Sequence, residues 1–308
     1  MNKLMVILVI AFVLFSGVIA APIEASTRIV KHELGQTEIP AEPKRVVDLV
    51  GVLDSLIALD LEVTAAQSEM SWAGFHFAPY VLERHQGAIT PIEDIYNPSV
   101  ELLISLEPDL ILLYKNMGDM YDDLSKIAPT VVLSFEWGDI RAGLRELGVI
   151  FAQEEKAEEV IEEYDQLARA ARNKLKAVVE ENEEVMFLRI TNKFYRVYNN
   201  FGQVGRLLYQ DLGFQIMKDY PADKWKKLQQ LSLEGLFFYN PDRIFLSTDN
   251  RTEAARLLSE LEKSNTWKNL KAVKNGYLYD ANDFLHYAQG PIGSRILIDQ
   301  ILEEVIIE

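Results

Sequence analysis

The chain has 308 residues, of which 49% are hydrophobic, and it carries a formal net charge of −16 and no cysteine. This length allows two hydrophobic cores of ordinary size. The acidic balance argues against a nucleic-acid partner, because phosphate binding needs a basic surface. The lack of cysteine excludes disulfides, thiolate nucleophiles and thiolate metal sites.

The N-terminus has the three regions of a secretory signal peptide. Lys3 is followed by the apolar run Leu4–Phe15 and then by small residues that end at Ala20. We expect residues 1–20 to be a cleaved signal peptide. A retained membrane anchor is the alternative, although the apolar run is short for a span of about 20 residues. The mature protein is then exported, to the periplasm or the outer face of the cell membrane.

A partial lipobox lies inside this leader. Residues 14–17, Leu-Phe-Ser-Gly, match its beginning, but Val18 stands where the lipidated cysteine would be. We therefore expect no cysteine-linked lipid anchor, and how the protein is retained at the membrane stays open.

The first half of the mature chain alternates between strands and helices. After a polar, extended lead-in over residues 26–43, we predict these elements: strand Arg45–Val50, a helix from Gly51 through Leu59, strand Val63–Ala66, an aromatic loop Trp72–Tyr80, helix Val100–Leu106, strand Leu110–Leu113, helix Met120–Ile127 and strand Thr130–Leu133. This alternation predicts an open, mostly parallel sheet covered by helices.

One long amphipathic helix is predicted over Glu154–Val179. Its apolar residues recur at steps of three and four, with glutamates crowding its start and arginines and lysines its end, the order that a helix dipole favours. At 1.5 Å per residue it would be about 39 Å long, enough to span two lobes. Gln153 is a poor N-cap, so the helix could instead run on from Asp139 with a break near Gly148.

The alternation resumes after this helix. We predict strand Val185–Arg189, strand Arg196–Tyr198, helix Gln203–Leu212 ended by Gly213, helix Leu233–Tyr239, strand Arg243–Leu246, helix Thr252–Leu261, strand Tyr277–Tyr279 and helix Ile292–Val305. The predicted fold class is α/β, with two lobes that each hold a central, mostly parallel sheet and are joined by one long helix. The divisions are residues 21–152 for the first lobe, 153–182 for the linking helix and 183–308 for the second lobe.

An internal repeat relates the two lobes. Residues 99–113 align without gaps on residues 232–246, sharing the Ser-x-Glu start, the Pro-Asp pair and apolar strand positions. Each copy predicts a serine N-cap, a short helix, a proline that stops it and a buried strand. Glu101 and Glu234 are equivalent. They either gain only from the helix dipole or form a pair of docking points, one on each lobe.

Several motifs in this order resemble those of the extracytoplasmic substrate-binding proteins of ABC importers for ferric siderophores, haem and cobalamin. They are Pro43–Asp48 with Asp54 and Leu59–Leu61, the two Ser-x-Glu…Pro-Asp copies, Trp267–Gly276, and Gly290–Ile292. The resemblance implies a monomeric, non-enzymatic carrier without a cofactor, which delivers its ligand to an ABC importer permease in the membrane. It also implies that Glu101 and Glu234 dock onto arginines of that permease.

Within the family, residues 199–213 look most like the ferric hydroxamate siderophore binders of Gram-positive bacteria. A hydroxamate siderophore is therefore the expected ligand, with haem or cobalamin as alternatives. The acidic net charge agrees, because a highly anionic catecholate complex would meet an unfavourable field.

A wrapped iron complex needs aromatic surface and hydrogen-bond donors rather than metal ligands. Such residues are expected where strands end, since ligands of open α/β sheets gather there. The candidate ligand-binding residues are Trp72, Phe75, His76, Lys115, Trp137, Arg189, Tyr198, Asn200, His286 and Tyr287. A guanidinium can donate to iron-bound hydroxamate oxygens, so Arg189 is a leading candidate with Trp72 and Tyr198. A core position for any one aromatic residue, or an ion pair at the rim for Arg189, is the alternative.

Two other classes of function compete with a siderophore carrier. Direct Zn²⁺ or Mn²⁺ binding needs several histidine and carboxylate ligands, whereas the four histidines here are scattered and form no His-rich loop. An enzyme would need a catalytic constellation, and the sequence has no phosphate-binding loop, dinucleotide fingerprint or nucleophile elbow. We expect neither a catalytic residue nor a metal ligand.

Overall fold

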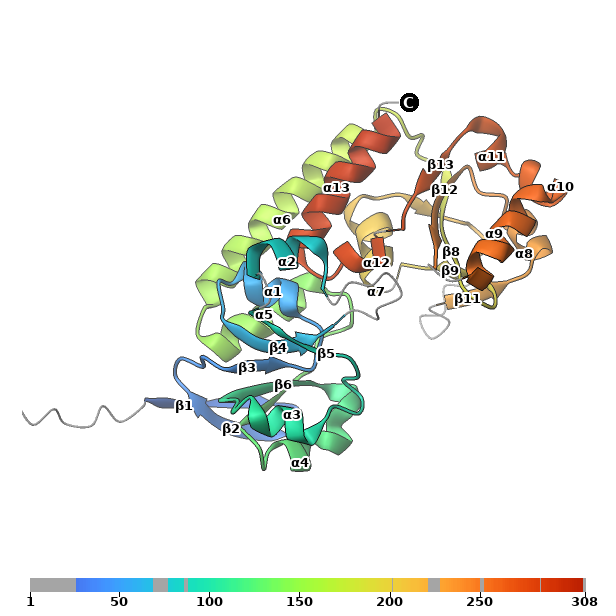
Figure 1. Cartoon of the computed structure of the whole chain (residues 1–308). Coiled ribbons are helices and arrows are strands. Elements are labelled where there is room, and N and C mark those ends of the chain that lie inside the picture. Colours follow the sequence, from blue (N-terminus) through green and yellow to red (C-terminus); the bar gives the residue numbers. More distant parts are fainter. Residues whose placement is uncertain are drawn as a thin grey trace, which may run out of the picture.

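The computed structural model describes residues 26–68, 77–85, 88–200, 202–220, 228–249, 252–282 and 284–306. Figure 1 shows two α/β lobes side by side, with helix α6, Glu154–Leu175, running from one to the other. The predicted fold class is therefore confirmed.

The first lobe is built on a five-stranded parallel sheet with strand order β5-β4-β3-β6-β7. Its central strands are buried on both faces, which explains their continuous apolar sequence. The elements are β3 Val46–Asp48, α1 Leu53–Ala58, β4 Val63–Gln67, α2 Pro79–His85, β5 Thr90–Ile92, α3 Val100–Ser105, β6 Leu110–Tyr114, a 3₁₀ helix Lys115–Met120, α4 Tyr121–Leu124, β7 Thr130–Leu133 and α5 Ile140–Phe151.

An antiparallel hairpin precedes this sheet, where the sequence predicted only an extended lead-in. Strand β1, Thr27–His32, pairs with β2, Gly35–Pro40. Val30 and Ile39 are buried while their neighbours are more exposed, so one face of the hairpin packs on the lobe. Too few apolar residues mark that face for the period of two to stand out in the sequence.

The second lobe holds a mixed sheet with strand order β11-β9-β8-β12-β13, and β10 also pairs with β8. Strands β8, β12, β13 and β10 are parallel, and β9 is antiparallel to both of its neighbours. The elements are β8 Glu184–Ile190, β9 Tyr195–Tyr198, α7 Gly202–Gly205 with a π-helical turn Arg206–Asp211, β10 Gln215–Ile216, β11 Leu228–Leu231, α8 Leu233–Tyr239, β12 Arg243–Thr248, α9 Thr252–Lys263, α10 Asn265–Lys268, α11 Lys271–Asn275, β13 Leu278–Asp280, α12 Phe284–Tyr287 and α13 Pro291–Ile306.

The internal repeat is structural as well as sequential. Ser99 caps α3 by accepting from the amide of Leu102, and Ser232 caps α8 by accepting from the amide of Gly235. The two Pro-Asp aspartates also have equivalent hydrogen bonds. Each connects the start of its own strand to the start of the neighbouring strand. The Asp109 carboxylate accepts from the amides of Lys44 and Arg45 before β3, and the Asp242 carboxylate accepts from the amide of Glu184 in β8.

Helix α6 contributes to both hydrophobic cores. Ala157 and Ile161 pack in the core of the first lobe, whereas the buried residues from Tyr164 to Leu175 pack in the core of the second. The helix ends at Leu175 instead of Val179. It is separated from α5 by Ala152, which adopts a left-handed conformation with φ of 52°. The break is therefore at Ala152 and not at Gly148.

Helix α13 makes a second connection between the lobes, through hydrogen bonds rather than through the chain. It packs along α6 in the second lobe, and Figure 1 shows its first turn reaching α1 of the first lobe. There the buried carboxylate of Asp54 accepts from the amides of Ile292 (2.9 Å) and Gly293 (2.8 Å) and from the Tyr80 hydroxyl. A side chain on Gly290 would overlap this carboxylate, so a glycine is required here.

Two ion-pair groups also join the lobes. Arg141 of α5 lies 2.9 Å from Asp211 of the second lobe, and the Tyr164 hydroxyl donates to the same aspartate. Arg206 of the second lobe lies 3.0 Å from Glu136 and 3.4 Å from Asp139 of the first lobe. The lobes are thus tied together on the side of α6 and α13.

Candidate functional site

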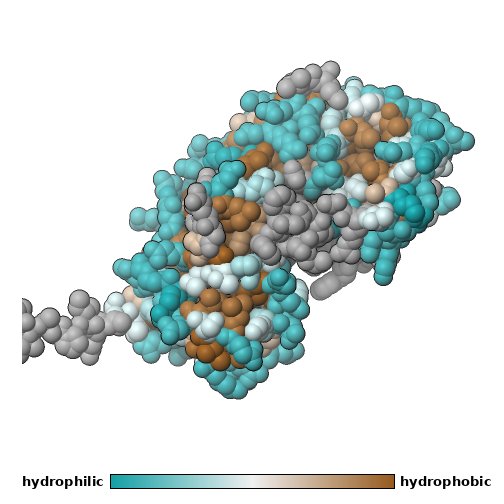
Figure 2. Space-filling view, viewed as in Figure 1, coloured by the Kyte–Doolittle hydropathy of each residue, from teal (hydrophilic) through white to brown (hydrophobic). Residues whose placement is uncertain are grey.

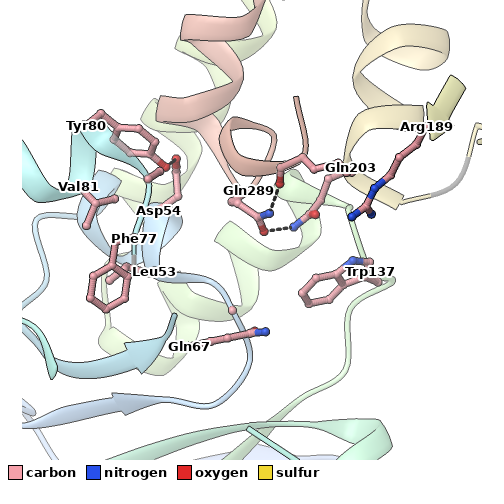
Figure 3. A pocket seen from close by; sticks show the side chains of 13 residues that line it. Leu53, Asp54, Gln67, Phe77, Tyr80, Val81, Trp137, Arg189, Gln203 and Gln289 are labelled. Atoms are coloured by element: carbon pink, nitrogen blue, oxygen red, sulfur yellow. Dashed lines mark hydrogen bonds between the residues drawn. The ribbon is translucent and has the colours of Figure 1, made fainter. Parts of the chain in front are cut away.

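A cleft of about 300 Å³ lies between the two lobes. Both lobes contribute to its wall, as Figure 3 shows. The first lobe supplies Gly51, Leu53, Asp54, Gln67, Phe77, Ala78, Tyr80, Val81 and Trp137, and the second supplies Arg189, Gln203, Leu285 and Gln289.

The turn after β3 shapes one wall of this cleft. The buried carboxylate of Asp48 accepts from three amides of that turn, those of Val50 (2.8 Å), Gly51 (3.0 Å) and Val52 (2.8 Å). Burial raises the pKa of Asp48 to about 6, although these hydrogen bonds oppose the rise. Gly51 is thereby held at the cleft with φ of 86°.

Gly51 leaves space for two larger side chains of the cleft wall. A β-carbon built on Gly51 would lie 2.6 Å from Oε1 of Gln67 and 3.3 Å from Cη2 of Trp137. Any other residue there would be strained by its positive φ and would push into the cleft. The sequence of the turn therefore keeps Gln67 and Trp137 close together at the wall.

Arg189 supplies a fixed cation at the opposite wall. It lies near the end of β8, where its Nε donates to Oδ1 of Asp249 (2.7 Å) and its Nη1 to the Tyr198 hydroxyl (3.3 Å). Its side chain is 17% exposed. Burial lowers the pKa of Arg189, but Tyr198 and Asp249 outweigh it and the net pKa is raised. The guanidinium is therefore charged and oriented, and Figure 3 shows that Arg189 and Trp137 both line the cleft.

Three glutamine amides line the cleft together with this cation. Gln67 ends β4 of the first lobe, while Gln203 and Gln289 come from α7 and from the loop before α13. Nε2 of Gln203 donates to Oε1 of Gln289 (2.8 Å), and Nε2 of Gln289 donates to the Leu285 carbonyl (2.5 Å). All three present neutral amide dipoles to a ligand, and these hydrogen bonds fix the amides of Gln203 and Gln289. None of the three was predicted from the sequence, since isolated glutamines carry no spacing signal.

Apolar side chains form the remaining wall. Phe77 and Val81 of the first lobe are buried in a cluster that Leu53 and Tyr80 share, and all four border the cleft. Figure 3 shows them on the side away from Arg189. The cleft thus has an apolar half and a polar half, an arrangement typical of a binding site for a small organic ligand.

The predicted binding residues fall into four groups. Trp137 and Arg189 line the cleft, and Tyr198 lies behind Arg189 as its hydrogen-bond partner. The Tyr287 ring lies against the Tyr80 ring at a tilt of 31°, with ring centroids 5.7 Å apart, next to the wall. The others that can be placed are not among the lining residues: Lys115 is exposed and donates to the Ser134 carbonyl, and Asn200 is exposed, with its carbonyl accepting from Gln210.

The remaining candidates cannot be placed against the cleft. Trp72, Phe75 and His76 lie outside the described residues, and so does the side chain of His286, whose backbone belongs to α12. In the described part of the chain, no three histidine, aspartate or glutamate side chains come together in a possible metal site. Among those same residues, no helix is long and apolar enough to cross a membrane.

Two lobes, a bridging helix and a ligand-sized cleft between them define a solute-binding protein of the periplasmic type. The periplasmic binding protein family matches residues 53–283, and the chain belongs to this family.

Individual relatives agree. The iron(3+)-hydroxamate-binding protein FhuD of Bacillus subtilis is 30% identical over 287 residues, covering 91% of this chain and 87% of the relative. The probable siderophore-binding lipoprotein YfiY of the same species is 29% identical, covering 90% and 87%. The crystal structure of Staphylococcus aureus SirA complexed with staphyloferrin B is similar at a TM-score of 0.79, with 30% identity, covering 91% of this chain and 99% of SirA.

Proposed function

We propose that this protein binds a ferric siderophore, of the hydroxamate class, and delivers it to an ABC importer. The observation that carries the proposal is a cleft lined by both lobes, to which Arg189 contributes a cation and Trp137 an aromatic ring. Two relatives support it: FhuD is named as an iron(3+)-hydroxamate-binding protein, and SirA is described in complex with staphyloferrin B.

The charge of the cleft favours a ligand with little net charge. Among the described lining residues, Arg189 is the cation and Asp54 the anion, and Asp54 is buried under the first turn of α13. Arg189 is itself paired with Asp249, so the polar wall offers one compensated cation and three neutral amides. A ferric hydroxamate complex suits this wall, because donors can reach its iron-bound oxygens without a large excess of positive charge.

The ligand class can be tested by tryptophan fluorescence. Ferrichrome and ferrioxamine should bind tightly and quench the tryptophan fluorescence of the protein. Ferric enterobactin should bind at least about tenfold more weakly because of its negative charge. Trp137→Phe should remove much of the quenching, and the buried Trp267 of the second lobe serves as an internal reference. Isothermal titration of the same variant separates lost signal from lost binding.

The same fluorescence experiment also tests four other ligands, which are haem, cobalamin, staphyloferrin B and free Zn²⁺. Preference for staphyloferrin B would replace the hydroxamate by the ligand of SirA. Preference for haem or cobalamin would change the ligand within the family. Tight binding of Zn²⁺ alone would contradict the proposed function, and turnover of any ligand would contradict a non-enzymatic carrier.

Docking to the permease through Glu101 and Glu234 is part of the same proposal. Both glutamates are exposed in the first turn of a repeat helix, one on each lobe. The pKa of Glu234 is lowered by its own backbone amide and by the Ser232 hydroxyl, so this carboxylate is charged at neutral pH. Two equivalent acids at a set separation suit a partner that presents two basic sites.

Replacing both glutamates by alanine should slow iron-siderophore uptake by cells in low-salt medium about tenfold, because exposed charges steer association, while leaving the siderophore affinity unchanged. Uptake of radiolabelled ferrichrome measures the first effect and fluorescence titration the second. The matched control is Glu33→Ala with Glu262→Ala, which removes one exposed acid from each lobe outside the repeat helices. Uptake by the Glu101 and Glu234 variant as fast as uptake by the control would contradict this docking role.

The proposed function also sets the location and state of the protein. We place it outside the cytoplasmic membrane, as a monomer without cofactor or catalytic activity. YfiY is named as a lipoprotein, whereas this chain has no cysteine that could be acylated.

A further inference from the structure

The two repeat helices expose a large apolar side chain at the same position. Ile104 of α3 is 58% exposed and Phe237 of α8 is 49% exposed. They are equivalent in the repeat, and each follows the exposed glutamate of its helix by three residues. Residues three apart lie on one face of a helix, so each lobe carries an acid and an apolar side chain next to each other.

The cores of the two lobes do not require these exposed apolar side chains. The intervening Leu103 and Leu236 are fully buried or nearly so, which means that each helix already places an apolar residue in its own core. Further exposed apolar residues surround the pair, Val100 on α3 and Phe238 on α8. Figure 2 shows the apolar surface over α3 on the first lobe.

The location of the two helices is consistent with a single partner. Figure 1 shows α3 and α8 on different lobes, both away from α6 and α13. A partner that touches both must therefore reach across the two lobes. Because the two sites share residue types and spacing, it should present two equivalent sites, each with a cation next to an apolar socket.

We propose that Ile104 and Phe237 enter apolar sockets on the two halves of the importer permease and supply most of the docking affinity. This inference rests on the proposed function and assigns separate tasks to the two kinds of residue. Exposed charges mainly steer association and are screened by salt. Apolar anchors that become buried in a socket mainly slow dissociation.

The test measures association and dissociation of labelled protein, loaded with ferrichrome, on right-side-out membrane vesicles from the source cells. Ile104→Ser with Phe237→Ser should raise the dissociation rate about 100-fold or more and leave the salt dependence of association unchanged. Glu101→Ala with Glu234→Ala should slow association about tenfold at low salt and flatten its salt dependence. The matched control is Val149→Ser, which removes an apolar side chain of 55% exposure from α5.

Each outcome has a separate meaning. If the serine variant dissociates like the control while the glutamate variant associates slowly, the sockets are absent and the proposed docking stands. If neither variant alters vesicle binding, docking itself is contradicted together with the inference. Fluorescence titration with ferrichrome checks both variants, since an altered siderophore affinity would show damage to the fold rather than to docking.

Discussion

Replacing Asp54 with alanine is expected to lower the free energy of unfolding by about 3 kcal/mol. The change leaves the amides of Ile292 and Gly293 and the hydroxyl of Tyr80 without this buried acceptor. It also removes a negative charge from the first turn of α13, where the helix dipole favours one. Urea denaturation followed by circular dichroism measures the loss. Hydrogen exchange should show faster exchange at the amides of Ile292 and Gly293.

Two further variants serve as comparisons for the Asp54 variant. Tyr80→Phe removes one of the three hydrogen bonds and should cost about 1 kcal/mol. Glu303→Ala removes an exposed acid from the same helix and should change the stability by less than about 0.5 kcal/mol. An Asp54 variant with unchanged denaturation and exchange would show that this contact does not hold the lobes together.

Replacing Arg189 with methionine should weaken ferric hydroxamate binding roughly 100-fold, which corresponds to the loss of charge-assisted hydrogen bonds to the ligand. Arg189→Lys should lose about tenfold, because a lysine keeps the charge but not the planar set of donors. Isothermal titration with ferrichrome measures both affinities.

One control for Arg189 concerns its ion-pair partner Asp249, which is mostly buried. Removing Arg189 alone leaves this carboxylate without its ion pair, so Arg189→Met should also be combined with Asp249→Asn. Arg145→Met removes an arginine of α5 whose ion pair with Glu158 is exposed, and it should bind ferrichrome normally. Normal affinity in the folded Arg189 variants would exclude a ligand contact at this residue.

The fold was largely predictable because its main signals are local. Continuous apolar runs marked the central strands, and the repeat showed that each lobe contains the same helix and strand unit. The short strands were missed for the opposite reason. Gln215–Ile216 has two residues, and its place in the sheet depends on pairing with Glu184 and Val185 about 30 residues earlier.

The site was predictable only in part. Arg189 and Trp137 could be found because Arg189 lies near the end of a strand and Trp137 follows one, and both strands run toward the cleft. Gln203 and Gln289 could not, since 86 residues separate them and only the folded chain brings their amides together. Asp54 was noted as part of a family motif, but its contact with α13, 238 residues away, required the structure.

The contact between Asp54 and α13 also limits which relative motions of the lobes remain. A single connecting helix would leave the lobes able to twist about its axis. A second attachment beside α6 opposes that torsion and leaves bending toward the cleft as the softer motion. That motion moves α3 and α8 relative to each other, because they lie on different lobes. A partner bound to both helices would then sense the open or closed state of the cleft.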